Sequence, residues 1–450
     1  MNLLAINWSE AGVKAAGFIL AISIIVVSHE LGHFLTAKWF KCRVDKFYLF
    51  FNPGFSLFKK KIGETEYGLG WIPLGGYVKI SGMIDESMDK EAMKLPSQSY
   101  EFRSKPAWQR LIIMVGGVVV NLLLGFFLYA MILWHYGDSY EPANQLKYGI
   151  ATDSLGQSIG LKDGDQILGL DGRYVEKLRR IPLEVILKNA KSIQVQRGED
   201  KLNLIIPEDF ASKLIRYKAV RFISVRFPFE GVDSVVKGTP ADKAGLKKHD
   251  KIISVNGVNT SFYSSFQREI PKNSNKEIAM LVVRGNDTLE KKAVISENGT
   301  LGLFPMLPKD TAVKIKTIHY TFLQAVPAGF NKSVQTLQEY WLQLKLIFSK
   351  KVKTSESLGS VISLGNMFPA AWDWEAFWSL TAFISLVLAL MNILPIPALD
   401  GGHVLFTLYE MISGRKPSDK FMEYAQMTGM VLLLGLTAYA LGLDIFRLFK

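Results

Sequence analysis

Two histidines and a glutamate form the first chemically suggestive group in this sequence, in the pentapeptide His29-Glu30-Leu31-Gly32-His33. On a helix, residues i and i+4 share one face, so both imidazoles can reach one zinc ion while the glutamate lies beside them. The glutamate can then accept a proton from a water molecule that zinc has made more acidic, and pass it to a leaving amine. The spacing therefore predicts hydrolysis of an amide bond at a metal site.

A catalytic zinc needs a third protein ligand and an open position. Asp400 is the best candidate, because it is the one acid at the end of an apolar stretch that Pro395 and Pro397 must interrupt. Such broken backbone is tolerated at membrane depth where it lines a cavity. His403 follows soon after and is a weaker candidate. A structural pair of histidines, bonded to neighbouring helices, remains the alternative.

Four apolar stretches must position these residues. Each is long enough, or nearly so, to cross a hydrocarbon layer of about 30 Å at about 1.5 Å per residue. They are Ala15–Ser28 with a continuation to about Lys38, Leu111–Trp134, Ala376–Leu399 and Ala425–Leu443. Ionisable side chains inside such a span are functional by default. Buried core helices are the alternative, and they suit the first stretch alone.

The formal charge of +12 could suggest nucleic acid, but many basic residues lie in two loops between apolar stretches, so we expect no nucleic acid partner. Thirteen Lys and Arg and eight Asp and Glu lie in Lys38–Arg110, and Arg415, Lys416 and Lys420 lie between the third and fourth stretches. Short basic loops mark the cytoplasmic side. We therefore expect both termini and the polar middle segment outside, although Arg447 and Lys450 argue mildly against an outer C-terminus. The lone Cys42 excludes a disulfide framework.

The polar middle segment contains an internal repeat. Gly160-Leu161-x-x-x-Asp165-x-Ile167, followed by Asp171-Gly172, recurs as Gly245-Leu246-x-x-x-Asp250-x-Ile252, followed by Asn256-Gly257. Each copy predicts a short helix, a turn, a strand and a hairpin. The pattern resembles a circularly permuted PDZ domain, and peptide C-termini are the partners that such domains imply. Two small β domains of no particular role are the alternative.

Two further segments carry structural expectations. The glycine-rich Thr65–Lys79 predicts a hairpin or a looped sheet. Apolar residues at spacings of three and four from Phe330 to Phe348 predict an amphipathic helix. That helix could lie along the outer membrane face or pack on the second repeat.

The motifs together resemble the site-2 protease family of intramembrane metalloproteases, in its bacterial branch with tandem PDZ domains. The resemblance rests on HExxH in a first transmembrane helix and on Asn392-x-x-Pro-x-Pro-x-x-Asp400-Gly in a later one, with the repeat between them. It covers nearly the whole chain. It implies a Zn²⁺ cofactor, the ligands His29, His33 and Asp400, and Glu30 as catalytic base. It also implies weaker, substrate-binding roles for Asn392, Gly75, Gly76, Tyr77 and Asn121.

The implied fold is a multi-pass α-helical membrane protein, with four transmembrane helices, a re-entrant β-loop over Thr65–Lys79 and two small mixed α/β PDZ-like domains outside. The expected parts are an N-terminal membrane part (1–138), PDZ-like domains (139–224 and 225–308), an amphipathic helix with a connector (309–374) and a C-terminal membrane part (375–450). The resemblance places the chain in the bacterial inner membrane. Its termini and PDZ-like domains would be periplasmic, and its active site near the cytoplasmic face.

The implied function is cleavage of transmembrane segments of single-span membrane proteins, after an earlier cut has removed the substrate's outer domain. Anti-sigma factors and remnant signal peptides are the substrates that the family suggests, and the PDZ-like pair would exclude intact proteins. A metal-ion transporter is one alternative, but it predicts ligands spread along a pore and inverted repeats. An inactive PDZ scaffold is another, and retention of all four catalytic residues argues against it.

Overall fold

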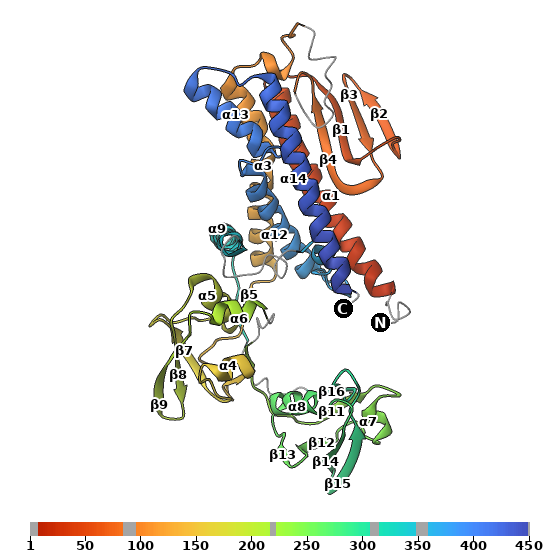
Figure 1. The fold of residues 1–450 in the computed structure, drawn as a ribbon, viewed down its shortest axis with the longest axis vertical. Coiled ribbons are helices and arrows are strands. Elements are labelled where there is room, and N and C mark those ends of the chain that lie inside the picture. The colour runs from red at the N-terminus through yellow and green to blue at the C-terminus, as the bar shows by residue number, and fades with distance from the viewer. Residues whose placement is uncertain (1–7, 84–95, 217–221, 307–314, 348–358, 449–450) are drawn as a thin grey trace. The chain divides into compact units, whose positions relative to one another are not determined.

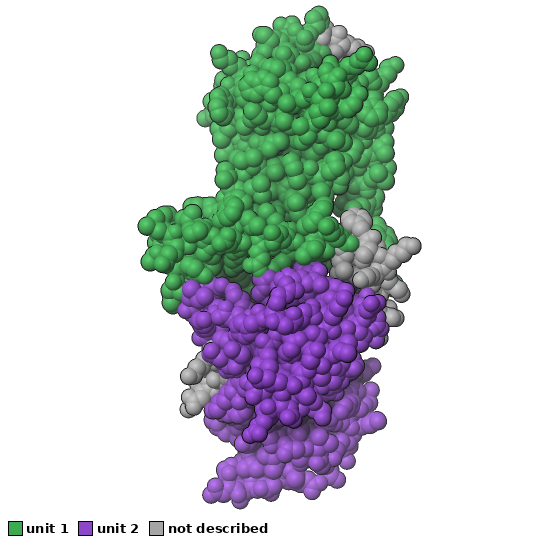
Figure 2. All heavy atoms as spheres, turned by 90° about the vertical axis from the view of Figure 1, so that its left-hand side faces the viewer, with its two compact units in different colours: residues 1–137, 319–349, 357–450 green, residues 138–318, 350–356 purple. Residues whose placement is uncertain are grey.

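The computed structural model describes residues 8–83, 96–216, 222–306, 315–347 and 359–448 (Figure 1). The chain divides into two compact units, coloured separately in Figure 2. The first unit comprises Met1–Gly137, His319–Ser349 and Ser357–Lys450, and the second comprises Asp138–Ile318 and Lys350–Glu356. The first unit is therefore assembled from segments that lie far apart in the sequence.

Four helices among the described residues are long and apolar enough to cross a membrane. They are α1 (Trp8–Trp39), α3 (Ala107–His135), α12 (Trp374–Ile393) and α14 (Asp419–Leu448). The predicted number of spans is confirmed, but the third helix ends at Ile393, before the predicted Leu399. Leu394 is extended at ψ 144°, the conformation that a following proline imposes. Pro395 also lacks the amide hydrogen that a continuing helix needs.

A further helix, α13 (Asp400–Ser413), follows this break. The sequence predicted only a loop here, between the third and fourth spans. The helix forms because Val404 and Thr407, three residues apart, are both buried and so share an inward face. Gly414 then ends α13 in the left-handed region, at φ 67°.

The predicted amphipathic helix is α9 (Phe322–Ile347), while Phe348 lies outside the described residues. It packs on α3 and α12, and Figure 1 shows it nearly end-on beside the upright α3. A Cβ on Gly329 would lie 2.5 Å from the backbone nitrogen of Ala130, so the two helices touch closely there. The rings of Phe330 and Phe126 lie 5.3 Å apart. These contacts show α9 packed on two of the membrane-crossing helices, which favours the first alternative, a helix along the membrane face, over packing on the second repeat.

A four-stranded sheet follows α1. Its strands, in spatial order, are β2 (Phe58–Ile62), β3 (Thr65–Leu69), β1 (Val44–Phe51) and β4 (Ile72–Ile80). β1 pairs in parallel with β3 and antiparallel with β4. The predicted looped sheet therefore forms, but β3 and β4 do not make a hairpin, because β1 lies between them. The aromatic β1 takes the central place, where both of its edges are hydrogen-bonded.

The sheet packs against α1 through β4. A Cβ on Gly76 would lie 2.7 Å from Cγ1 of Val26 and 2.6 Å from the carbonyl oxygen of Tyr48. Only a residue without a side chain allows this approach. As a result β4 runs alongside the helix that carries His29 and His33.

The second unit contains two hydrophobic cores, one for each copy of the repeat. The first copy comprises β6 (Ile150–Thr152), α4 (Ser154–Ser158), β7 (Gln166–Leu170), α5 (Ile181–Lys188), β8 (Ser192–Arg197), β9 (Asp200–Ile205), α6 (Phe210–Arg216) and β10 (Ile223–Val225). The second comprises β11 (Val232–Val235), α7 (Pro240–Lys243), β12 (Lys251–Val255), β13 (Val258–Asn259), α8 (Tyr263–Glu269), β14 (Glu277–Arg284), β15 (Asp287–Val294) and β16 (Leu303–Pro305). A ribbon of β5 (Asp138–Tyr140) and β17 (Lys316–Ile318) joins the two ends of this segment.

The repeated aspartate has the same structural role in both copies. Asp250 is fully buried, accepts a hydrogen bond from the backbone of Lys247 at 2.8 Å and pairs with Arg284 at 2.7 Å. Asp165 makes the matching bond to Lys162 at 2.8 Å and the matching pair with Arg197 at 2.7 Å. A buried carboxylate needs such partners. The repeated sequence pattern thus reflects the same local structure in both copies.

Candidate metal centre

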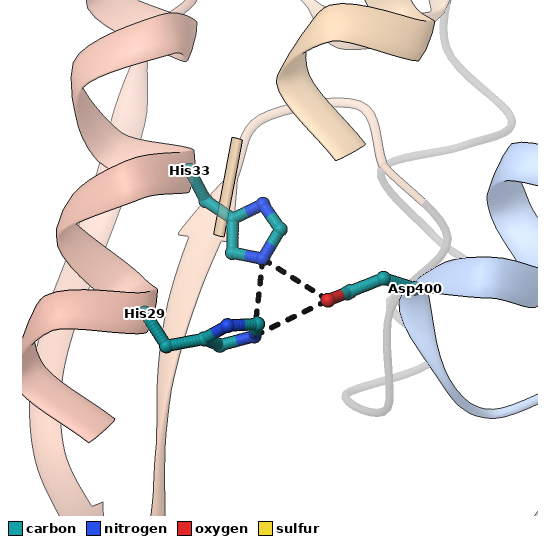
Figure 3. A group of neighbouring side chains, drawn as sticks. All are labelled: His29, His33 and Asp400. Atoms are coloured by element: carbon teal, nitrogen blue, oxygen red, sulfur yellow. Dashed lines mark hydrogen bonds and ion pairs between the residues drawn. The ribbon is translucent and has the colours of Figure 1, made fainter. Parts of the chain in front are cut away.

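Helix α1 presents both histidines of the pentapeptide on one buried face (Figure 3). Their Nε2 atoms lie 3.3 Å apart. Oδ2 of Asp400 lies 3.2 Å from Nε2 of His29 and 3.4 Å from Nε2 of His33. Among the described residues, these three side chains form the one cluster of His, Cys, Asp or Glu whose atoms could share a metal ion. The structure therefore brings together two residues from the first span and one from the far end of the chain.

Glycines on α1 and α3 make room for the imidazoles. A Cβ on Gly32 would lie 2.3 Å from the carbonyl oxygen of Gly116, so the two backbones are in direct contact. A Cβ on Gly117 would lie 2.4 Å from Nε2 of His33 and 2.7 Å from Cε1 of His29. Small residues permit this close helix packing. Here they also leave the space that the histidine rings fill.

The loop between α12 and α13 sets the position of Asp400. Ala398 lies in the left-handed region at φ 76°, which is unfavourable for a residue with a Cβ. Strain of this kind persists only where the surroundings enforce it, and it concentrates at functional sites. A Cβ on Gly401 would lie 1.9 Å from the carbonyl oxygen of Leu394, so the loop folds tightly over the start of α13. This fold turns the carboxylate toward the histidines.

The geometry of the three atoms suits zinc. Ligand atoms held tetrahedrally at about 2.0–2.1 Å from zinc lie about 3.3 Å from one another, and the three observed separations are 3.2, 3.3 and 3.4 Å. In addition, Oδ2 of Asp400 is buried without a hydrogen-bond partner. A buried carboxylate oxygen in that state needs a cation. The donor set of two imidazoles and one carboxylate also leaves the fourth position open, as in catalytic zinc sites.

A cavity of about 380 Å³ opens beside the three side chains. Glu30 lines it together with His29, His33 and Asp400. Other wall residues come from β4, α13 and α14, and they include Gly76, Tyr77, Val78, His403, Gln426 and Met430. The site therefore has a candidate base and space for a peptide chain next to the candidate ligands.

Comparison with known proteins decides the family. Residues 17–436 match the sequence profile described as Peptidase family M50. The chain belongs to peptidase family M50. This is the site-2 protease family that the motifs resembled, so the protein is a membrane metalloendopeptidase with zinc as its cofactor.

Full-length relatives support the M50 assignment. The regulator of sigma E protease of Haemophilus influenzae is 28% identical, over 96% of this chain and 98% of the relative. The regulator of sigma-E protease RseP of Escherichia coli is 27% identical, also over 96% and 98%. A Neisseria meningitidis relative whose name includes zinc metalloprotease is 28% identical, with the same coverage. Similarity therefore extends over both units of this M50 peptidase.

The weaker predicted site residues lie in three different places. Gly76 and Tyr77 line the cavity beside the candidate ligands. A Cβ on Gly75 would instead lie 2.6 Å from the ring of Phe51. Two asparagines contact His29 from opposite sides of its ring: the amide nitrogen of Asn392 lies 3.2 Å from Nε2, and that of Asn121 lies 3.4 Å from Nδ1.

Sequence reasoning missed part of the cavity wall. Gln426 of α14 lines the cavity and contacts Nε2 of His403. His403 lies three residues after Asp400, so one helical face carries both side chains, and that spacing could have indicated a place in the site. Gln426 gave no such signal, because it stands near the start of an apolar span far from either motif.

Proposed function

We propose that this M50 peptidase is an intramembrane endopeptidase that cuts transmembrane segments of single-span membrane proteins near the cytoplasmic face. The ligands are His29, His33 and Asp400, and the catalytic base is Glu30. One observation carries the proposal: three potential ligand atoms converge at tetrahedral spacing beside a cavity that Glu30 also lines. A metal-ion carrier would instead spread its ligands along a path.

The chemistry follows from the residues around the cavity. Zinc, when bound, supplies a Lewis acid that polarises a carbonyl group and makes water more acidic. Glu30 takes a proton from the attacking water and delivers it to the leaving nitrogen. Asn392 lies against the same edge of His29 as the candidate ligands do. Its amide is therefore placed to orient a substrate carbonyl or the metal site itself.

β4 is the candidate binding strand for an unwound substrate. A transmembrane helix hides its carbonyl groups in internal hydrogen bonds, so it must unwind before hydrolysis. β4 is an edge strand of the sheet and contributes Gly76, Tyr77 and Val78 to the cavity wall. An extended peptide can add to such an edge and replace the lost hydrogen bonds. The opposite edge, β2, carries the exposed run Lys59–Lys61, and lysines block strand addition.

The sheet is proposed as a re-entrant element. α1 ends at Trp39 and β1 begins at Val44, yet Gly76 of β4 packs on Val26. Val26 lies about 20 Å along α1 from Trp39, at about 1.5 Å per residue. The sheet therefore returns alongside the first span for much of its length. The basic Lys38–Arg110 loop supports a cytoplasmic origin for it.

The two copies of the repeat are proposed as periplasmic PDZ-like domains that exclude substrates with intact outer domains and receive new peptide C-termini. Their matching cores and buried aspartates support a tandem of like modules. The division into five parts, at 138, 224, 308 and 374, is proposed with them. The names of the Haemophilus and Escherichia relatives support an anti-sigma factor as substrate, and remnant signal peptides are a second proposed class.

A Glu30→Gln variant tests the function. We expect purified wild-type protein to cleave a tagged single-span substrate that lacks its outer domain, and the variant to leave it intact while binding as much zinc. Equal cleavage by both proteins would refute the proposal. Chelator treatment followed by zinc addition should abolish and then restore wild-type activity.

Cysteine labelling tests the topology. In a Cys42→Ala background, the exposed positions Lys201 in β9 and Lys60 in β2 can each be changed to cysteine. We expect a membrane-impermeant maleimide, added to spheroplasts, to label Lys201→Cys only. Labelling of Lys60→Cys before the membrane is opened would contradict a cytoplasmic sheet.

A further inference from the structure

Asn121 of α3 is a fully buried polar residue behind the metal centre. It is not among the residues that line the cavity. Its amide nitrogen lies 3.4 Å from Nδ1 of His29, while its amide oxygen is buried without a hydrogen-bond partner. A buried acceptor left in this state is unfavourable, because it has lost its hydrogen bonds to water without gaining others. The position of Asn121 therefore calls for an explanation other than contact with substrate.

His33 shows what a metal-facing histidine requires here. Its Nδ1 lies 2.9 Å from the backbone carbonyl oxygen of Ile113. A carbonyl oxygen can only accept a hydrogen bond, so Nδ1 carries the proton and Nε2 keeps its lone pair. That lone pair points toward Asp400, in the direction of the proposed ion. An outer hydrogen bond of this kind fixes the tautomer and orientation of a metal-ligating histidine.

His29 has the same need, but no backbone carbonyl of the described residues forms the corresponding hydrogen bond. Its Nε2 faces Asp400 and His33, so Nδ1 must carry the proton and must donate it to an acceptor. Among the described residues, the amide of Asn121 is the one polar group within hydrogen-bond distance of Nδ1. Asn392 cannot serve, because its amide lies on the opposite, Nε2 side of the ring.

We propose that Asn121 is a positioning residue, whose amide oxygen accepts the Nδ1 proton of His29 and so presents Nε2 to zinc. The oxygen and nitrogen of an amide are nearly indistinguishable in shape. A half-turn of the amide exchanges its oxygen and nitrogen, and therefore places the oxygen against Nδ1 while the rest of the side chain keeps its position. The Ser385 hydroxyl donates a hydrogen bond to the backbone carbonyl oxygen of Asn121 at 2.8 Å, and this bond helps to fix this part of α3. The inference rests on the proposed zinc-binding role of His29.

The test is zinc affinity of the full chain, purified in detergent and measured by competition with a chelator. Asn121→Asp supplies an acceptor of the same shape, Asn121→Leu fills the same volume without one, and Asn121→Ala removes both. Thr381→Val is the matched control. Thr381 is another fully buried polar residue of the membrane helices, and its hydroxyl bonds only within α12.

We expect Asn121→Leu and Asn121→Ala to bind zinc about 10- to 100-fold more weakly, as loss of an outer partner usually does. Asn121→Asp should bind zinc at least as tightly as wild type, and Thr381→Val should match wild type. A role in packing alone predicts the reverse order, in which leucine is tolerated and a buried carboxylate is not.

Wild-type affinity in the Ala and Leu variants would overturn the inference, and so would equal losses in the Asp and Leu variants. If the Leu variant does not fold, the comparison of Asp with Ala decides. Failure of the proposed function would look different. In that case the wild-type chain itself would bind no zinc, or Glu30→Gln would cleave substrate normally.

Discussion

A Cβ atom placed on Gly117 would lie 2.4 Å from Nε2 of His33. The two residues belong to different helices, and the imidazole occupies the space that any side chain on α3 would need. The glycine thus leaves space for a ring of the proposed metal centre, beyond allowing α1 and α3 to pack.

Changing Gly117 to alanine should therefore weaken zinc binding. We expect a loss of about tenfold or more in zinc affinity, by analogy with other disruptions next to metal ligands, and a matching loss of proteolysis. Gly435→Ala in α14 is the control, because nothing lies within 4 Å of a Cβ there. Equal zinc affinity in Gly117→Ala and Gly435→Ala would show that the histidine rings do not depend on this space.

Gly76 tests the role of β4 separately from the metal. A methyl group there would meet Tyr48 and Val26 and would push β4 away from α1. We expect Gly76→Ala to lower kcat/KM for a single-span substrate by about tenfold, roughly the effect of 1.4 kcal/mol on the barrier. Its zinc affinity should remain that of wild type. Gly12→Ala, with open space around it, is the control, and a loss of zinc by Gly76→Ala would argue against a substrate-binding role.

The ion pair between Arg110 of α3 and Glu410 of α13 should stabilise the helix that carries Asp400. The Arg110 side chain is 9% exposed and that of Glu410 is 20% exposed. Removing one partner of a fully buried pair is unfavourable by about 3–5 kcal/mol, and the effect here should be smaller because Glu410 is partly exposed. We expect Arg110→Met and Glu410→Leu each to lower the thermal stability of the purified protein. The double variant should recover most of the loss, and additive losses would exclude a coupled pair.

The contact between the two copies of the repeat should weaken only in acid. Arg268 of α8 donates hydrogen bonds to Asp163 and to the carbonyl oxygen of Thr152. Burial raises the pKa of Asp163, but hydrogen bonds from Arg268 and Thr152 and the charges of Arg268 and Arg226 bring that pKa below its ordinary value of 3.8. A carboxylate with a lowered pKa contributes stability above its ordinary pKa and loses it as the pH falls through the lowered one.

Asp163→Asn should therefore lower the free energy of unfolding of the second unit by about 1–2 kcal/mol at neutral pH, somewhat less than the roughly 1.5–3 kcal/mol of a hydrogen bond to a charged group, because the ion pair is partly exposed to solvent. The difference from wild type should stay constant from pH 7 to pH 5 and shrink below about pH 4. Thermal unfolding of the full chain across this pH range measures it. A difference that vanishes already near pH 6 would point to another titrating group.

Local patterns in the sequence were enough to predict a metalloprotease and to locate most of the long helices. The four-residue spacing of His29 and His33 needs only a helix to put both rings on one side. Long apolar stretches in a membrane must be helical, since every backbone group has to be bonded internally, and all four appear as helices. Pro395 and Pro397 likewise predicted that the third apolar helix is interrupted, because proline cannot continue a helix.

Non-local pairing decided the rest. The position of β1 between β3 and β4 depends on long-range strand pairing, for which no local pattern specifies the partner. The helix α13 and the cavity residue Gln426 became apparent only when distant segments were packed together. The neighbour of Nδ1 on His29 also depends on tertiary structure, since Asn121 reaches the ring from another helix.

The sequence by itself thus determined which side chains could hold zinc and act as a base, because residue type and helical spacing suffice for that chemistry. Tertiary structure alone decided that Asp400 meets the two histidines at 3.2 and 3.4 Å. That meeting depends on glycine contacts between helices and on a strained loop at Ala398. Both arise from the packing of segments that are remote along the chain.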